Sequence, residues 1–317
     1  MRIFTSFIPP PGGLQSAGLA AMVRPAMTHI LTLIADRAAT TLDAGTIDSV
    51  RDAVAGGSAT VLSVGEAVDI PLTAEPDLAV VRAALGAALV DAIVSEAATR
   101  RKSLLIADMD STMITGETLD ELADFAGLKD KIAAITARAM NGELDFKSAL
   151  RERVLMLKGL PVSTLDQTWE RVRLTDGARE LVATMRANGA YTALVSGGFT
   201  FFTARVAALL GFHMHKSNLL LDDGATLTGF VAEPILDRET KLETLRALAQ
   251  ERTLPLSATV AVGDGANDLD MLGAAGLGVA FHAKPIVAAA ARARVDHANL
   301  RALLFAQGYR AADFVTA

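Results

Sequence analysis

The chain has 317 residues, of which 51% are hydrophobic and 21% are charged. It is therefore long enough for two domains and too apolar to be a mainly disordered protein. Thirty-six acidic against thirty basic side chains give a net charge of −6, which argues against a broad nucleic-acid surface. The absence of cysteine excludes disulfides, thiolate metal sites and a cysteine nucleophile.

Residues 1–26 are expected to form a flexible extension. The Pro-Pro-Pro-Gly-Gly segment at 9–13 interrupts any apolar run that could act as a signal peptide. No run in the sequence approaches the roughly 18 apolar residues of a membrane span. We therefore expect a cytoplasmic protein without a membrane partner, and a folded part that begins near Met27.

Residues 27–98 have the pattern of a small α+β domain. Gly56 and Gly57 suit the end of a first helix, and Pro76 suits the first turn of a second. No cluster of His, Asp or Glu and no Gly-rich phosphate loop is present, so this unit carries no visible chemistry. The predicted strands are 30–35, 59–64 and 67–72, and the predicted helices are 46–55 and 76–97.

Residues 102–317 have the pattern of a parallel α/β sheet. Apolar runs at 103–107, 191–195 and 258–262 are followed by polar residues and separated by helical stretches. In such sheets ligands bind at the carboxyl ends of the strands, so the polar residues are expected to share one rim. The first two runs are about eighty residues apart, too far for a simple crossover, which predicts a helical cap inserted at about 117–180.

The first polar segment is Asp108-Met109-Asp110-Ser111-Thr112. An aspartate at a strand end can serve as a nucleophile while the second exchanges protons. Two neighbouring acids repel each other, so a bound cation or a retained proton is expected. An Asx turn that caps the next helix would use the same residue types.

Three further features converge on the same rim. Carboxylates and glycines in the segment 263–268 (Gly-Asp-Gly-Ala-Asn-Asp) suit Mg²⁺ binding, the segment 196–198 (Ser-Gly-Gly) could hold phosphate oxygens, and Lys241 lies on a helix. Each of them alone is equally typical of a turn or a solvated helix. Together with the acid pair, they predict phosphoryl transfer.

These four motifs resemble those of the haloacid dehalogenase superfamily, and the resemblance narrows to its phosphoserine phosphatase family. It covers about residue 102 to the C-terminus and includes Glu117, the cap-like segment 138–161 and the segment 281–285, Phe-His-Ala-Lys-Pro. The resemblance implies a Rossmann-like core with a helical cap, and Mg²⁺-dependent hydrolysis of O-phosphoserine to serine and phosphate, the last step of serine biosynthesis.

The resemblance also implies the catalytic roles. Asp108 becomes the aspartyl phosphate, while Asp110 is the general acid for the leaving serine and then the base for water. Mg²⁺ is held by the Asp108 carboxylate, the Asp110 main-chain carbonyl and Asp264.

Substrate binding is implied in the same way. Ser196, Gly197 and Lys241 grip the phosphate, Asn267 lies beside it, and Asp268 positions metal-bound water or Lys241.

Glu117 and Arg153 are implied to recognise the amino acid, binding the substrate ammonium and carboxylate respectively. A planar guanidinium is well suited to a carboxylate because it can bind both oxygens. From local sequence alone, Glu117 could simply complement a helix N-terminus, and Arg153 could lie on a solvated helix face.

Two alternatives remain open. One is a related phosphatase or phosphotransferase acting on another small phosphate, such as phosphohomoserine. The other is an amino-acid-sensing regulatory protein, because residues 27–98 resemble a degenerate ACT-like domain. The segment 35–39, Ala-Asp-Arg-Ala-Ala, lacks the glycine expected in its first ligand loop. We therefore expect dimerisation or packing from this domain rather than serine binding, with a homodimer as the candidate assembly.

Overall fold

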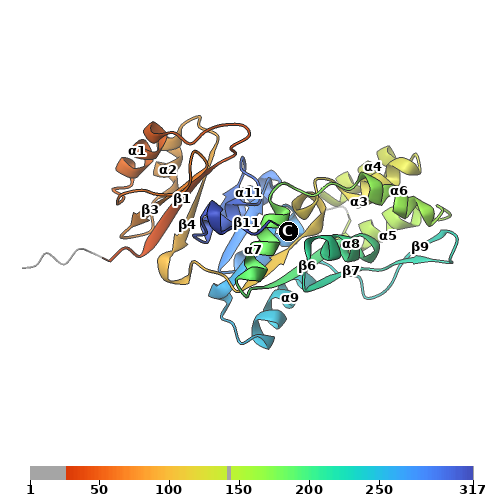
Figure 1. The fold of residues 1–317 in the computed structure, drawn as a ribbon. Coiled ribbons are helices and arrows are strands. Elements are labelled where there is room, and N and C mark those ends of the chain that lie inside the picture. The colour runs from red at the N-terminus through yellow and green to blue at the C-terminus, as the bar shows by residue number, and fades with distance from the viewer. Residues whose placement is uncertain (1–25, 141–143, 317) are drawn as a thin grey trace, which may run out of the picture.

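The computed structural model describes residues 26–140 and 144–316. The predicted extension at 1–26 lies outside the described residues apart from Ala26, and so do three residues of the cap-like segment. Figure 1 shows an N-terminal α/β unit at one end, a central sheet with its helices, and a group of helices at the other end. No helix within the described ranges is both long and apolar enough to cross a membrane.

The N-terminal unit is an antiparallel sheet of order β2-β3-β1-β4 with two helices on one face. Asp43 and Asp77 cap the two helices by accepting backbone N–H groups of their first turns. Leu31, Leu33 and Ile70 fill the core beneath them. The elements are β1 (His29–Ala35), α1 (Ala44–Ala53), β2 (Thr60–Ser63), β3 (Ala67–Leu72), α2 (Leu78–Leu85) and β4 (Val90–Glu96).

The predicted helix at 76–97 is wrong in its second half. Helix α2 ends at Leu85 because Gly86 adopts a positive φ of 57°, and strand β4 follows. In β4, Val90 and Ile93 are buried while the strand pairs antiparallel with β1. The apolar residues of this run fit helical spacing, but its β-branched residues favour a strand.

The central sheet is parallel, as expected for an α/β fold, with the order β12-β11-β10-β5-β6-β7. Strand β5, the first of this sheet in the sequence, shows why the predicted apolar runs contain no polar residues. Leu105 and Ala107 face one cluster, while Leu104 and Ile106 face the other, so both faces are buried. The strands are β5 (Leu104–Ala107), β6 (Tyr191–Phe199), β7 (Met214–Asn218), β10 (Thr259–Gly263), β11 (Leu277–Phe281) and β12 (Ala293–Val295).

Helices cover both faces of this sheet. One face is covered by α7 (Ala178–Ala187), α8 (Thr200–Leu210) and α12 (Ala302–Ala306), and the other by α9 (Arg238–Glu251), α10 (Leu269–Ala274) and α11 (Pro285–Ala290).

Four helices beyond the rim form the group at the far end of the molecule (Figure 1). They are α3 (Thr118–Phe125), α4 (Lys129–Met140), α5 (Phe146–Leu155) and α6 (Ser163–Arg171). A hairpin of β8 (Leu220–Asp222) and β9 (Leu227–Val231) joins this group, since β9 packs on α5. The helical group therefore includes a second chain segment that the sequence pattern did not predict.

The N-terminal sheet packs its second face against the rest of the chain. Ile34, Ala67 and Ile93 on that face belong to the same apolar cluster as Leu303 of α12. Both faces of the small sheet are thus covered, one by its own helices and the other by the core.

Buried charges line this junction. Arg100 contacts the Asp69 carboxylate at 2.6 Å and also donates to the carbonyl oxygen of Phe305. Arg301 pairs with Glu66 at 2.9 Å. The junction is therefore held by specific ion pairs as well as by apolar packing.

Candidate active site

The strand ends bring the predicted residues to one rim of the central sheet. Asp108 follows β5, Ser196 lies in the last part of β6, and Asp264 follows β10. A cavity of about 660 Å³ lies over this rim. Eight of the ten predicted site residues line it: Asp108, Asp110, Glu117, Arg153, Ser196, Gly197, Asp264 and Asn267.

The other two predicted residues, Lys241 and Asp268, are buried behind the cavity wall, with 2% and 0% exposure. The Lys241 ammonium lies 2.8 Å from Asp108 Oδ1 and 2.6 Å from Asp268 Oδ1. Burial alone would lower the pKa of Lys241, but the two carboxylates raise it. A lysine that local sequence would assign to the solvated surface is thus a buried ion-pair partner of Asp108.

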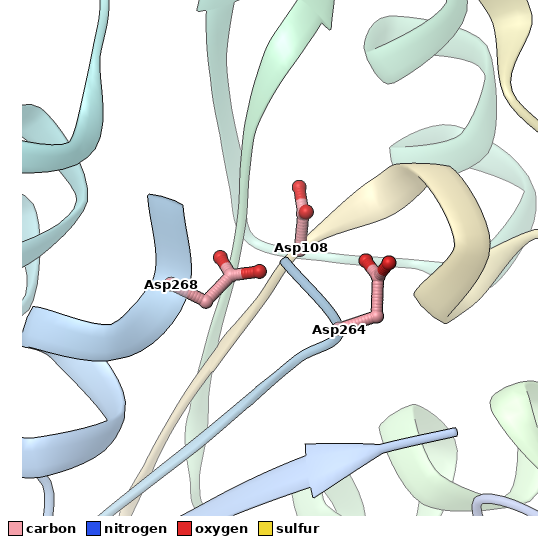
Figure 2. A group of neighbouring side chains, drawn as sticks. All are labelled: Asp108, Asp264 and Asp268. Carbon is pink, nitrogen blue, oxygen red and sulfur yellow. The ribbon is translucent and has the colours of Figure 1, made fainter. Parts of the chain in front are cut away.

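Three carboxylates meet beside this lysine. Ligand oxygens of Asp108, Asp264 and Asp268 lie within 4.8 Å of one another, and Figure 2 shows them facing a common space. Burial, followed by the charges of the other two acids, raises the pKa of Asp264 to about 7. Three acids against one buried lysine leave negative charge unmatched, so this donor set fits a metal cation.

The three carboxylates are not equivalent. Both oxygens of Asp268 are engaged, one by Lys241 and the other by the N–H of Gly265 at 3.0 Å. The Asp264 carboxylate has a weak 3.5 Å contact from the Thr112 hydroxyl. Asp108 and Asp264 are therefore the freer ligands, and Asp268 supports the lysine. The Asp110 side chain is not a member of this cluster.

Asp110 has a different environment. Burial, followed by the nearby charges of Glu117 and Asp108, raises its pKa well above the ordinary value. Its Oδ1 accepts the backbone N–H of Thr118 at 2.9 Å. A carboxyl whose pKa is raised in this way is suited to donate a proton during catalysis.

The two glycines in the last part of β6 lie close to side chains of the site. A Cβ at Gly198 would lie 2.7 Å from Asp110 Oδ2, and one at Gly197 would lie 3.1 Å from the Phe146 ring. The Gly198 N–H donates to Ser196 Oγ at 2.9 Å. The backbone can therefore approach a ligand closely at this point.

Glu117 and Arg153 line the same cavity from the helical side. Glu117 accepts the Ser111 hydroxyl at 2.7 Å. Burial lowers the pKa of Arg153, whose Nε donates to the Ala149 carbonyl at 3.3 Å. No carboxylate in the described residues lies within ion-pair distance of Arg153, which leaves its guanidinium available to an anion.

Sequence reasoning missed several lining residues. Lys284 lies 3.9 Å from the Asp264 carboxylate, and the strand-end rule could have found it because it closely follows β11. Phe146, whose residue type alone suggests a core position, also lines the cavity. The remaining apolar lining includes Leu119, Leu144, Leu150 and Ile286, for which the sequence offered no local signal.

The chain is similar to several known proteins. A family model described as haloacid dehalogenase-like hydrolase matches residues 105–273. A phosphoserine phosphatase of Lactococcus lactis is 44% identical over 203 residues, which are 64% of this chain and 94% of that protein. One from Streptomyces coelicolor is 46% identical over 73% of this chain. The chain spans only 56% of that protein's length.

Solved structures extend the likeness to the N-terminal unit. The unliganded structure of a probable phosphoserine phosphatase from Vibrio cholerae has a TM-score of 0.73 and 33% identity. The likeness covers 90% of this chain and 88% of that one.

Proposed function

Because the chain belongs to the haloacid dehalogenase-like hydrolase family and is a relative of phosphoserine phosphatases, we propose that it hydrolyses O-phosphoserine to serine and phosphate. One observation carries the proposal. The Asp108 carboxylate is held 2.8 Å from a buried lysine, beside an acid, Asp110, whose pKa is raised. This pairing of a fixed nucleophile with a neighbouring acid of raised pKa suits phosphoryl transfer through an aspartyl phosphate.

In the first step, the Asp108 carboxylate attacks phosphorus and the bond from phosphorus to the serine oxygen breaks. Lys241 and the Met109 N–H both contact Asp108 Oδ1 and so fix the orientation of the carboxylate. Asp110 gives its proton to the leaving serine oxygen. In the second step, Asp110 takes a proton from water, which attacks phosphorus and releases Asp108 and inorganic phosphate.

Mg²⁺ is the proposed cofactor, and when bound it would neutralise charge on the phosphoryl oxygens. The Asp108 and Asp264 carboxylates would hold it, with the main-chain carbonyl of Asp110. The support is the unmatched charge of the buried carboxylates and the preference of Mg²⁺ for oxygen ligands.

The phosphoryl group is proposed to bind Ser196, Gly197, Lys241 and Asn267, with Asp268 holding Lys241 in place. Within the cavity, Glu117 would contact the substrate ammonium and Arg153 its carboxylate. The support for Arg153 is a half-buried guanidinium with no ionic partner in the described residues. Helices α3 to α6, with the β8–β9 hairpin, would serve as the cap.

The test compares phosphoserine with phosphohomoserine and p-nitrophenyl phosphate, with and without EDTA. We expect phosphoserine to be preferred, EDTA to abolish turnover, and Arg153→Ala to remove the preference. Arg151→Ala is the matched control, since Arg151 lies on the same helix but is exposed and pairs with Glu233 at 2.6 Å. Equal turnover of all three esters by the wild type would exclude the proposed substrate.

The expected features outside the site stay predictions: an ACT-like N-terminal domain, a homodimer, a cytoplasmic location, and no nucleic-acid or membrane partner. The element order β1-α1-β2-β3-α2-β4 supports the first. Sedimentation of the full chain and cell fractionation would test the assembly and the location.

A further inference from the structure

Asn218, the last residue of β7, is a buried amide that lies outside the residues lining the cavity. Its Nδ2 donates to the carbonyl oxygen of Gly197 at 2.8 Å. Its Oδ1 accepts the N–H of Leu236 at 2.8 Å. With 2% exposure, this side chain makes both contacts away from bulk water, where each contributes more than on the surface.

The first contact determines which way a peptide group faces. In a trans peptide the carbonyl and the following N–H point in opposite directions. Because Asn218 holds the Gly197 carbonyl, the Gly198 N–H points the other way, and it donates to Ser196 Oγ at 2.9 Å. Two consecutive glycines impose little steric preference on this peptide, so its orientation depends on an external bond.

The orientation of this peptide sets the polarity of the Ser196 hydroxyl. A serine oxygen that accepts an N–H keeps its own hydrogen free to donate. Within the described residues the Ser196 hydroxyl has no other partner, and it lines the cavity. If the peptide turned over, the Gly197 carbonyl would take the serine hydrogen, and an oxygen lone pair would face the incoming phosphate.

The second contact joins this loop to the lysine. Leu236 directly precedes Asp237, which caps helix α9, and Lys241 lies in the first turns of that helix. The Asn218 side chain therefore connects the segment 196–198 with the segment that leads into helix α9 and Lys241.

We propose that Asn218 is a positioning residue that, by holding the Gly197–Gly198 peptide, makes Ser196 a hydrogen-bond donor to the phosphoryl group. The inference rests on the proposed function only in taking a phosphoryl group as the ligand. Asn218 itself is not among the residues that line the cavity.

The direct test is Asn218→Asp, which keeps the shape and the acceptor for the Leu236 N–H. It replaces with a carboxylate oxygen the amide nitrogen that donates to the Gly197 carbonyl at 2.8 Å and, more weakly, to the Leu236 carbonyl at 3.4 Å. We expect kcat/KM to fall roughly 100-fold, the scale of losing one preorganised donor. Inorganic phosphate should also inhibit more weakly. Asn218→Ala removes the same donor without adding a buried charge, and should show the same weakened inhibition. Unchanged phosphate inhibition in a folded Asn218→Ala protein would overturn the proposal.

Gln307→Glu is the matched control, because Gln307 is a buried amide with the same bonding pattern. It donates to the Leu303 carbonyl at 2.9 Å and accepts the Lys102 N–H at 3.2 Å, outside the site. We expect it to lower Tm but to leave kcat and phosphate inhibition unchanged. If it lost as much activity as Asn218→Asp at the same loss of Tm, the role of Asn218 would be structural and the proposal would fail.

A double-mutant cycle with Ser196→Ala tests the route of the effect. If Asn218 acts through the serine hydroxyl, Asn218→Asp should cost little once that hydroxyl is gone. If the losses of kcat/KM in the two single variants multiply in the double variant, the proposal is contradicted.

All variants are also assayed on p-nitrophenyl phosphate. Wild-type turnover of that ester without turnover of phosphoserine would exclude the proposed substrate and leave the inference on Asn218 intact.

Discussion

Among the residues that the structure describes, buried carboxylates occur at the domain junction and at the sheet rim, and their surroundings differ. At the junction of the N-terminal unit and the core, Asp69 and Glu66 each contact an arginine. Asp91 accepts the backbone N–H groups of residues 296, 297 and 298 at 2.8 to 3.1 Å. Each junction acid therefore has its own cation or its own set of donors.

The carboxylates at the sheet rim are not matched in this way. Asp108 and Asp268 share the buried Lys241 ammonium, whereas Asp264 lies 3.9 Å from the exposed Lys284, and burial raises the pKa of Asp264 to about 7. Matched buried charges stabilise one arrangement of the chain, whereas unmatched ones are maintained where a ligand or a reaction completes them. Buried acidic residues thus stabilise the fold at the junction and provide reactive or ligand-binding groups at the sheet rim.

The largest expected effect is on catalysis. Asp108→Asn should reduce turnover at least about 1,000-fold, because an amide is a poor nucleophile. The metal-free protein should keep its Tm, since the change removes one charge from an unmatched cluster. Steady-state assay and thermal unfolding check both parts. Acid quench with ³²P-labelled substrate should label wild-type Asp108.

Asp270→Asn is the control for that change, since Asp270 is a peripheral aspartate that pairs with Arg238. Turnover of Asp108→Asn within tenfold of the wild type would exclude the nucleophile assignment.

At the junction the expected effect is on stability alone. Arg100→Ala leaves Asp69 buried without its cation and should lower the free energy of unfolding by about 3 kcal/mol. The kcat of the folded protein should not change. Urea unfolding and assay of the same preparation measure the two quantities. Arg101→Ala is the control, because Arg101 is exposed and donates to the Gly308 carbonyl. A large loss of kcat in Arg100→Ala would show that the two clusters are coupled.

The third prediction concerns pH and metal removal. In the metal-free fold, burial raises the pKa of Asp264 to about 7 and that of Asp268 to about 6. Unfolded aspartate titrates near 3.9, so the folded protein binds more protons between these values. The stability of the metal-free protein should therefore fall as pH rises through this window.

Excess Mg²⁺ should reverse that loss, because the cation binds the ionised carboxylates. We expect Mg²⁺ to raise Tm more at about pH 8 than at about pH 5. Scanning calorimetry with EDTA or Mg²⁺ measures the difference. An equal rise in Tm at both pH values would contradict the assignment of the metal ligands.

The smallest effect is expected at the third junction acid. Burial raises the pKa of Asp91 in spite of its three backbone donors. Asp91→Asn keeps an acceptor oxygen and should cost about 1 kcal/mol in urea unfolding. Asp52→Asn on the exposed face of α1 should cost less than about 0.5 kcal/mol. A loss at Asp91 as large as that in Arg100→Ala would mean that its full charge is required.

The local pattern of apolar residues was sufficient to predict three strands of the central sheet and the polar residues at their carboxyl ends. The runs at 103–107, 191–195 and 258–262 correspond to β5, β6 and β10, because strands buried on both faces must be apolar throughout. The same reasoning failed at residues 86–97, where apolar spacing fitted a helix but Gly86 ends it and β4 pairs with β1. Hydrophobic spacing alone does not separate a helix from a strand when partners are distant in sequence.

The order of chemical groups along the chain determined which residues could meet: acids after the first and last of these strands, a hydroxyl after the middle one, and a lysine on a helix. Only the tertiary structure decided that Lys241 is buried against Asp108, that Asn218 holds the Gly197 carbonyl, and that Arg301 meets Glu66 across 235 positions of sequence. Such pairings depend on which surfaces pack together, and packing is a property of the whole chain rather than of any short segment of it.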